Sequence, residues 1–382
     1  MRIGLVVPGF SADERDWCIP ALRDLAARLA TTDDVDVLAL RYPHRPGRYA
    51  VFGARVTALG GGARPTWRSA GLWRRALAWL AAEHRRAPFD VLHACWATES
   101  GALAAVAGRR LGVPTVVSLA GGELVGLGDI GYGGQLAAAE RLKVRLALGR
   151  ATAVTAGSRA LLDRAAPWLR GHPPDLVRRI PLGVDTALFR PDPAQAPDEP
   201  PALVHAASLV PVKDQVTLLR AAALLRLRGL AFTLDLAGDG PLRPALGALA
   251  GELGLAPVAR FHGAVPHHDL PALYRRGAVF VLSSRHEAQC LAALEAAACG
   301  LPVVGTAVGV VPELAPYAAL AVPTRDPAAL AGALETLLRD PARRARLGLA
   351  AQARVAAEYD LGSCAARFRA LYADLAGDGR RA

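Results

Sequence analysis

Short runs of apolar, largely β-branched residues alternate with longer alanine- and leucine-rich stretches along the whole chain. This alternation is typical of strand–helix–strand units. The runs are continuously apolar, which indicates strands buried on both faces and therefore a parallel sheet. In the first half, we expect strands at residues 3–7, 35–40, 90–94, 115–120 and 152–156, with helices at 16–30, 69–83 and 98–111.

In the second half, the same alternation of strand-like and helix-like segments begins again after a linker at residues 181–201, which ends in PDPAQAPDEPP. Strands are expected at 202–209, 232–238, 258–263, 278–284 and 302–306, with helices at 214–228, 241–253, 269–276 and 290–299. Residues 326–376 are expected to be helical, with interruptions near Pro341 and Asp360. A chain of 382 residues also exceeds the usual size of a single core. We therefore predict two doubly wound, Rossmann-like α/β domains, residues 1–187 and 188–355, followed by a helical segment, 356–382.

The cysteines and the apolar segments bear on cellular location. Five cysteines are scattered without paired spacing, which favours a reducing cytosol and neither a disulfide framework nor a zinc site. The opening MRIGLVVPGF is more consistent with a buried strand than with a signal peptide. No stretch of eighteen uncharged apolar residues is present, so a spanning helix is not expected. A cytoplasmic protein is predicted.

The net charge of +11 lies mainly in the first half, where residues 1–190 carry 26 Arg and Lys against 16 Asp and Glu. Such a field suits an anionic membrane surface or an anionic acceptor. Nucleic acid is not expected as a partner, because no zinc-finger spacing or RNP-like motif accompanies the charge. Residues 64–86 combine Trp67, Trp73 and Trp79 with arginines, so they could form a basic amphipathic helix at the membrane periphery. The alternative is that the apolar face of this helix packs on the first-domain sheet.

The sharpest local signal is SSRHEAQCLAALEAAACGLPVVGT, residues 283–306, which is typical of a strand, loop, helix, turn and strand. A helix beginning near Gln289 would direct free backbone amides at a phosphate. Glu287 and Glu295 would then lie roughly 12 Å apart along the helix axis. This spacing could place Glu287 at the sugar and Glu295 at the ribose of an extended nucleotide sugar. The alternative is an ordinary helix with solvated acids.

Lysine is rare in this chain, and one of its two lysines falls at a strand exit. Lys143 and Lys213 stand against 43 arginines. Lys213 follows the strand expected to end near Leu209, where an ammonium could neutralise a diphosphate leaving group. A surface lysine is the alternative. His262, His267 and His268 are interpreted as loop residues, because no carboxylate or cysteine lies at metal-ligand spacing; no metal or cofactor is predicted.

These segments resemble the retaining family-four glycosyltransferases, which have the two-domain GT-B fold. The matching motifs are SLVPVKD, GDGPLR, FHGAV and the paired glutamates in the second half, and DVLHACW, GVPTVVSLAGGE and IPLGVDTALFRP in the first. The resemblance implies two domains facing a cleft, with the last helices packing back on the first domain. It also implies transfer of a hexose from a nucleotide-diphosphate sugar to a glycan, lipid-linked or small-molecule acceptor, with retention of anomeric configuration.

The resemblance also implies roles for individual residues. Glu287 and Lys213 are expected to be catalytic, at the donor sugar and the diphosphate respectively. The donor side is expected to include Ser208, Gly238, Gly240, Val265, Gln289, Cys290, Leu291 and Glu295, where the backbone near Val265 could contact a nucleobase. The acceptor side is expected to include Gly9, Phe10, His93 and Glu123, with a core histidine as the alternative for His93.

The chain departs from the family pattern at three places. Ser208 stands where an arginine is usual, and Ala288-Gln289-Cys290 replaces a glycine–aromatic–glycine. Ala120-Gly121-Gly122-Glu123 replaces a His-Gly-x-Asp pattern. Two alternatives follow: a sugar-nucleotide epimerase of the same fold, and a degenerate protein that binds sugar nucleotides or glycans without turnover. Asp34-Val35-Asp36 formally matches the Asp-x-Asp of metal-dependent transferases, but a solvated loop is favoured there.

Overall fold

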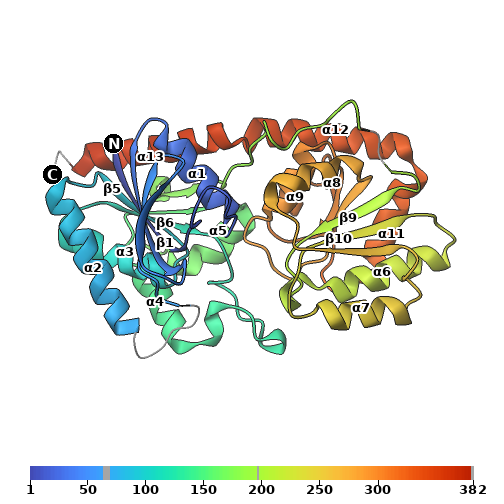
Figure 1. Ribbon diagram of the computed structural model, residues 1–382, viewed down its shortest axis with the longest axis horizontal. Coiled ribbons are helices and arrows are strands. Elements are labelled where there is room, and N and C mark those ends of the chain that lie inside the picture. Colours follow the sequence, from blue (N-terminus) through green and yellow to red (C-terminus); the bar gives the residue numbers. More distant parts are fainter. Residues whose placement is uncertain (63–68, 196–197, 380–382) are drawn as a thin grey trace. The chain divides into compact units, whose positions relative to one another are not determined.

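The computed structural model describes residues 1–62, 69–195 and 198–379 (Figure 1). The chain forms two compact units, one made of Met1–Gly183 with Leu361–Ala382 and the other of Val184–Asp360. Each unit has its own sheet and its own hydrophobic core. The two α/β domains expected from the sequence are therefore present.

In the first unit, the strands are ordered β3-β4-β2-β1-β5-β6-β7-β8. Neighbouring strands are parallel except β3 and β4, which form an antiparallel hairpin at one edge. This hairpin and β8 were not predicted, because their buried and exposed residues do not form continuous apolar runs. The bounds are β1 (Arg2–Gly9), β2 (Asp34–Tyr42), β3 (Gly47–Val51), β4 (Ala54–Ala58), β5 (Val91–Cys95), β6 (Thr115–Leu119), β7 (Ala153–Ala156) and β8 (Val177–Arg179).

Helices cover both faces of this sheet. Apolar residues of α1 and α13 pack with one face, and apolar residues of α2 and α3 pack with the other. The helices are α1 (Pro20–Ala30), α2 (Ser69–Arg86), α3 (Glu99–Leu111), α4 (Ala138–Leu148), α5 (Arg159–Ala165) and α13 (Leu361–Gly379), with short 3-10 turns η1 (Gly128–Ile130), η2 (Gly134–Leu136), η3 (Ala166–Trp168) and η4 (Pro174–Leu176).

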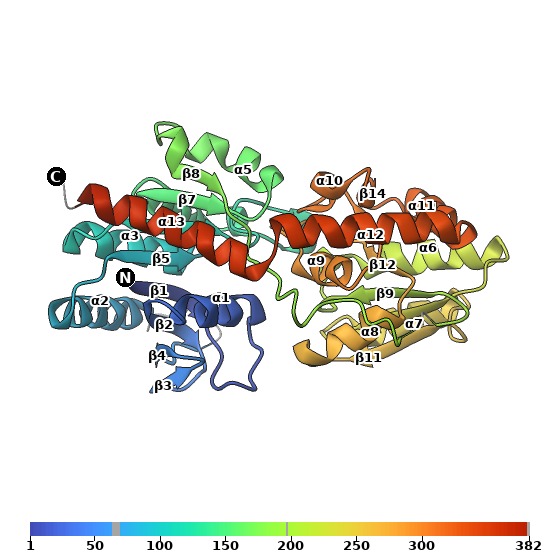
Figure 2. The same cartoon turned by 90° about the horizontal axis from the view of Figure 1, so that it is seen from above.

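The last helix, α13, is built into the first unit (Figure 2). The Arg369 Nε atom lies 2.7 Å from Asp33 Oδ2 and donates a hydrogen bond to it. Phe368 and Tyr372 are fully buried against residues of β1, β5 and α1. The expected return of the C-terminal helices to the first domain is confirmed for α13, whereas α12 belongs to the second unit.

In the second unit, the strands are ordered β11-β10-β9-β12-β13-β14 and every neighbouring pair is parallel. Apolar residues of α8, α9 and α12 gather in one core cluster, and those of α6, α7 and α11 in another. The strands are β9 (Ala202–Ala206), β10 (Thr233–Ala237), β11 (Ala259–Gly263), β12 (Val279–Leu282), β13 (Val303–Thr306) and β14 (Ala319–Val322). The helices are α6 (Gln215–Leu227), α7 (Arg243–Glu252), α8 (Leu270–Arg276), α9 (Leu291–Ala298), α10 (Val311–Leu314), α11 (Pro327–Arg339) and α12 (Pro341–Glu358), with 3-10 turns η5 (Pro211–Lys213) and η6 (His267–Asp269).

The strand order fixes where each unit can bind a ligand. In the second unit, the chain runs from β9 outward to β10 and β11 and then returns to β12 on the other side of β9. In the first, it leaves β1 for β2 and returns to β5 on the other side. Ligands of open α/β sheets bind at such a reversal, beyond the carboxyl ends of the two strands. The loops after β9 and β12, and those after β1 and β5, are therefore the candidate ligand loops.

Candidate functional site

Lys213 and Glu287 meet at the reversal of the second sheet. Lys213 ends η5, in the loop after β9, and Glu287 lies in the loop between β12 and α9. The Lys213 Nζ atom donates a hydrogen bond to Glu287 Oε1 at 2.5 Å, and Ser284 Oγ donates to the same oxygen at 2.6 Å. Two side chains that the sequence suggests for one ligand thus form an ion pair, although 74 positions separate them.

Hydrogen bonds join the two loops directly. Ser283 Oγ donates to the backbone oxygen of Lys213 at 2.8 Å, and the backbone N–H of Arg285 donates to the oxygen of Val212 at 2.8 Å. The Asp214 carboxylate caps α6 by accepting from the backbone N–H of Thr217 at 3.4 Å, and it also accepts from the Thr217 hydroxyl at 2.8 Å. These bonds hold the backbone on both sides of the Lys213–Glu287 pair.

The helix that follows Glu287 starts later than the sequence indicates. Cys290 has φ 75°, a left-handed conformation that ends the loop, so α9 begins at Leu291 instead of near Gln289. The Gln289 carbonyl accepts from the N–H of Val310 at 2.9 Å, and the side chains of Gln289 and Cys290 are buried. The free amides of a helix start therefore belong to Leu291 and the residues after it.

Glu295 lies on α9 and is 8% exposed. Its Oε1 atom is 2.9 Å from His267 Nε2, and Tyr274 donates a hydrogen bond to Oε2 at 3.4 Å. Burial and this carboxylate raise the pKa of Tyr274 well above its usual value. His267 is itself buried, and its Nδ1 atom has no hydrogen-bond partner in the described part of the chain. The interpretation of His267 as a loop residue missed this contact.

Two glycines let the loop after β10 approach the loop after β9. Gly238 has φ 138°, and a Cβ atom there would lie 1.9 Å from the carbonyl oxygen of Ala207. A Cβ on Gly240 would lie 2.5 Å from the oxygen of Leu209. Ser208, between these contacts, is exposed, and Val265 after β11 is half-buried. The expected donor-side glycines are thus required by close backbone approach.

Of the residues expected on the acceptor side, two are core residues instead. Gly9 ends β1, but the Phe10 side chain is buried in the first core. His93 is fully buried on β5; its Nδ1 lies 2.6 Å from the Tyr372 hydroxyl and its Nε2 lies 2.7 Å from Ser118 Oγ. Burial lowers the pKa of His93 to about 3, so the ring is neutral. Both ring nitrogens are occupied, and the core alternative holds for His93.

Glu123 follows β6 and is buried. Its Oε1 atom accepts hydrogen bonds from the backbone N–H groups of Ala120 at 3.0 Å and Ala97 at 3.5 Å, while Oε2 has no partner among the residues that the structure describes. Burial raises the pKa of Glu123, because desolvation disfavours its charged form. The carboxyl group therefore joins the loops after β5 and β6 and keeps one oxygen unused.

Comparison with known proteins identifies the family. The family model described as Glycosyltransferase Family 4 matches residues 21–188, and the one described as Glycosyl transferases group 1 matches residues 189–354. The D-inositol 3-phosphate glycosyltransferase of Frankia alni is 35% identical over 300 residues, which cover 72% of each chain. This chain belongs to the family-four glycosyltransferases.

Other relatives and solved structures agree with this assignment. The GDP-mannose-dependent alpha-(1-6)-phosphatidylinositol monomannoside mannosyltransferase of Mycolicibacterium smegmatis is 35% identical over 47% of this chain and 51% of its own. A sucrose-phosphate synthase from Thermosynechococcus elongatus has a TM-score of 0.81 and 22% identity, covering 98% of this chain and 99% of its own. Anabaena HepE in complex with UDP and glucose has a TM-score of 0.75 and 19% identity, with 98% and 100% covered. The glycosyltransferase therefore has the GT-B fold.

Helix α2 of this glycosyltransferase does not have a free apolar face. Leu80 is fully buried and Trp73 and Leu77 pack against the first-unit core, while Trp73 Nε1 donates to Glu99 Oε1 at 3.1 Å. Arg64, Trp67 and Arg68 of the proposed membrane segment lie outside the described residues. A membrane contact of α2 would thus depend on exposed arginines such as Arg74 and Arg75. Within the described part of the chain, no helix is both long and apolar enough to cross a bilayer.

The Asp-x-Asp pair of the glycosyltransferase lies at the amino-terminal start of β2. Asp34 Oδ1 accepts a hydrogen bond from Arg55 NH1 at 2.9 Å, and Asp36 Oδ2 accepts from Arg2 Nε at 2.8 Å. Both carboxylates are therefore engaged by arginines, away from the loops after β1 and β5. Among residues 1–62, 69–195 and 198–379, no group of three His, Cys, Asp or Glu side chains is placed to hold a metal ion.

Proposed function

We propose that this glycosyltransferase moves a hexose from a nucleoside-diphosphate sugar to a hydroxyl group of a glycan, lipid-linked or small-molecule acceptor, with retention of anomeric configuration. The Lys213–Glu287 ion pair at the sheet reversal carries the proposal, because it joins a cation suited to diphosphate and a carboxylate suited to sugar hydroxyls. A GDP-mannose-dependent relative and a fold neighbour solved with UDP and glucose support the donor class.

In the proposed reaction, the Lys213–Glu287 ion pair breaks when the donor binds, and both side chains then contact the donor. Lys213 would turn from Glu287 to the diphosphate and stabilise the negative charge that develops on it. Glu287 would accept hydrogen bonds from hydroxyl groups of the donor sugar. Free amides at the start of α9 would add to the anion-binding field. Glu295, held by His267, would accept from the ribose hydroxyls.

Retention is proposed to follow from attack on the same face that the leaving group departs from. The bond between the anomeric carbon and the diphosphate oxygen breaks, and a bond from the acceptor oxygen to that carbon forms. The acceptor proton passes to the departing diphosphate oxygen, so no protein-bound intermediate is needed. A proton NMR time course of the first-formed product tests this step, and an inverted product would place the enzyme outside the retaining class.

The chelator experiment tests the proposed independence of metal ions. Transfer is expected to continue at an unchanged rate in excess EDTA, since the proposed chemistry uses Lys213 and amides at the diphosphate. Complete loss of activity in EDTA, restored by manganese, would contradict the proposed metal independence and would support metal-dependent transfer.

One observation favours binding without turnover as a second candidate. Ser208 leaves the loop after β9 without the arginine usual at that position, so the diphosphate would meet one side-chain cation fewer. Incubation with a panel of sugar nucleotides separates the candidates: release of nucleoside diphosphate supports the transferase, whereas tight binding without release or transfer supports the binding protein.

A cytoplasmic location is part of the proposal and is supported by the five free cysteines.

A further inference from the structure

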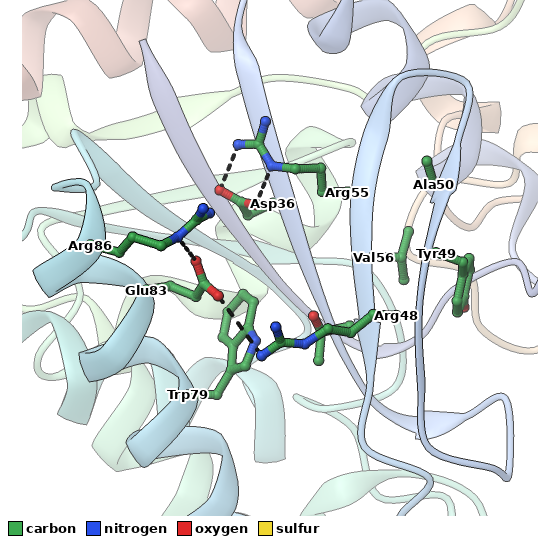
Figure 3. A pocket seen from close by; sticks show the side chains of 10 residues that line it. Asp36, Arg48, Tyr49, Ala50, Arg55, Val56, Trp79, Glu83 and Arg86 are labelled. Atoms are coloured by element: carbon green, nitrogen blue, oxygen red, sulfur yellow. Dashed lines mark hydrogen bonds and ion pairs between the residues drawn. The ribbon is translucent and has the colours of Figure 1, made fainter.

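A pocket in the first unit lies between α2 and the β3–β4 hairpin (Figure 3). Its volume is about 420 Å³, within the range of small-molecule sites. Its wall includes Asp36 of β2 and Arg55 of β4, which are partners in neighbouring strands and lie near the amino-terminal ends of those strands. Glu83 and Arg86, at the end of α2, also line it. The pocket is therefore separate from the loops after β1 and β5, where this unit is expected to meet its acceptor.

The two carboxylates of the pocket are already neutralised. Asp36 accepts hydrogen bonds from Arg55 Nε at 2.8 Å and from Arg2 Nε at 2.8 Å. These arginines hold the pKa of Asp36 below its usual value. Glu83 accepts from Arg86 Nε at 3.0 Å and from Arg2 NH2 at 3.2 Å. The arginines, more than the carboxylates, are therefore the groups that this pocket offers to a charged ligand.

Hydrogen-bond donors, in contrast, remain unused at the pocket. Arg48 of β3 is 73% exposed as a side chain, and its nearest carboxylate oxygen, on Glu83, is 3.9 Å away, beyond hydrogen-bond distance. Arg86 donates through Nε to Glu83, and its two terminal nitrogens make no hydrogen bond within residues 1–62, 69–195 and 198–379. The Nε1 atom of Trp79, in the pocket wall, is buried and has no hydrogen-bond partner among the described residues. Figure 3 shows the guanidinium groups of Arg48, Arg55 and Arg86 converging from three elements on Glu83 and Asp36.

We propose that this pocket binds the phosphate group of a phosphorylated sugar. The three lining arginines and Arg2 exceed in charge the two lining carboxylates and Asp34, which pairs with Arg55, and planar guanidinium groups match phosphate oxygens well. A phosphate oxygen would accept from Arg48 and Arg86, which have donors to offer. The remaining volume would hold the sugar. This site is independent of the proposed donor site in the second unit.

The test uses the full chain and calorimetric titration with glucose 6-phosphate at low ionic strength. The double variant Arg48→Ala/Arg86→Ala removes the two exposed guanidinium groups assigned to the phosphate and leaves the Arg2–Asp36–Arg55 contacts intact. Arg85→Ala is the matched control, because Arg85 is an exposed arginine in the same turn of α2 that does not line the pocket. We expect the double variant to lose affinity at least tenfold and the control to stay within twofold of wild type.

Three further outcomes decide the matter. Saturable binding that is equal in wild type and the double variant would overturn the proposal, since the phosphate would then lie elsewhere, including the donor site. Equal affinity for glucose would overturn it as well, because the phosphate would contribute nothing. Phosphatidylglycerol vesicles form the last arm: pelleting that depends on Arg48 and Arg86, without binding of glucose 6-phosphate, would overturn the soluble ligand in favour of a lipid headgroup.

Discussion

The Nε2 atom of His267 lies 2.9 Å from Glu295 Oε1, and both side chains are buried in the second unit. His267 ends the loop after β11, while Glu295 belongs to α9. The ring of His267 also packs against Phe189, with ring centroids 5.1 Å apart. These contacts fix the imidazole and give Glu295 one defined orientation at the proposed ribose site.

Replacement of His267 by alanine is expected to weaken donor binding through Glu295. The variant leaves the carboxylate without its short hydrogen bond, and loss of a bond to a charged group costs about 1.5–3 kcal/mol. We expect the KM for the donor to rise while kcat changes little, because His267 touches the ribose-binding residue and not the reacting atoms. His268→Ala is the control, since His268 is exposed next to it. A fall in kcat with an unchanged KM would assign His267 another role.

Lys213→Ala is expected to weaken donor binding by about 1.5–3 kcal/mol, because the diphosphate loses its cation. Lys143→Ala is a matched control: the other lysine forms a pair with Glu140 on α4, remote in sequence from the site.

Glu287→Gln is expected to lower the rate of transfer more than nucleotide affinity, since Glu287 is assigned to the sugar. Calorimetry with the accepted nucleotide and a transfer assay measure the two effects. Wild-type affinity in Lys213→Ala would show that the site is misassigned.

The residues in these predictions differ in how much the sequence says of them. Lys213 and Glu287 could be assigned to one ligand because each follows an expected strand and both lie in motifs that resemble those of the family. Their ion pair could not be foreseen, since it depends on the turn at η5 and on the loop after β12. His267 was missed because nothing local distinguishes a loop histidine from one that packs against a helix 28 positions later.

The same limit applies to two residues of the first unit. Phe10 and His93 stand at strand ends, where sequence spacing alone does not separate a side chain facing a ligand from one facing the core. The β3–β4 hairpin and with it the proposed phosphate pocket were absent from the sequence prediction, because edge strands with arginines lack an apolar run. The buried strands next to them were predicted well, since burial on both faces leaves a continuous pattern.

Gly238→Ala is expected to destabilise the second unit and to disturb donor binding. A left-handed residue at φ 138° costs about 1–3 kcal/mol for alanine, and its Cβ would also clash with the carbonyl oxygen of Ala207. Gly247→Ala is the contrasting variant, because Gly247 lies in α7 with open space around it and should gain roughly 0.5–1 kcal/mol. Urea unfolding of both variants measures the difference. A neutral Gly238→Ala would mean that this loop relaxes without cost.

His93 is expected to make the first unit sensitive to acid. Burial lowers the pKa of His93 from 6.5 to about 3, so below pH 6.5 the unfolded chain binds a proton that the folded protein does not take up until about pH 3. The stability contributed by neutral His93 is therefore complete above pH 6.5 and decreases as the pH falls from 6.5 toward 3, by about 1.4 kcal/mol per pH unit.

His93→Gln removes this proton while keeping polar atoms near Tyr372 and Ser118. Between pH 6.5 and 5, the free energy of unfolding should fall by roughly 1–2 kcal/mol less in the variant than in wild type. His44→Gln, at an exposed position of the same unit, is expected to keep the wild-type slope. Urea unfolding at the two pH values measures the slopes, and equal slopes in His93→Gln and wild type would contradict a neutral, buried His93.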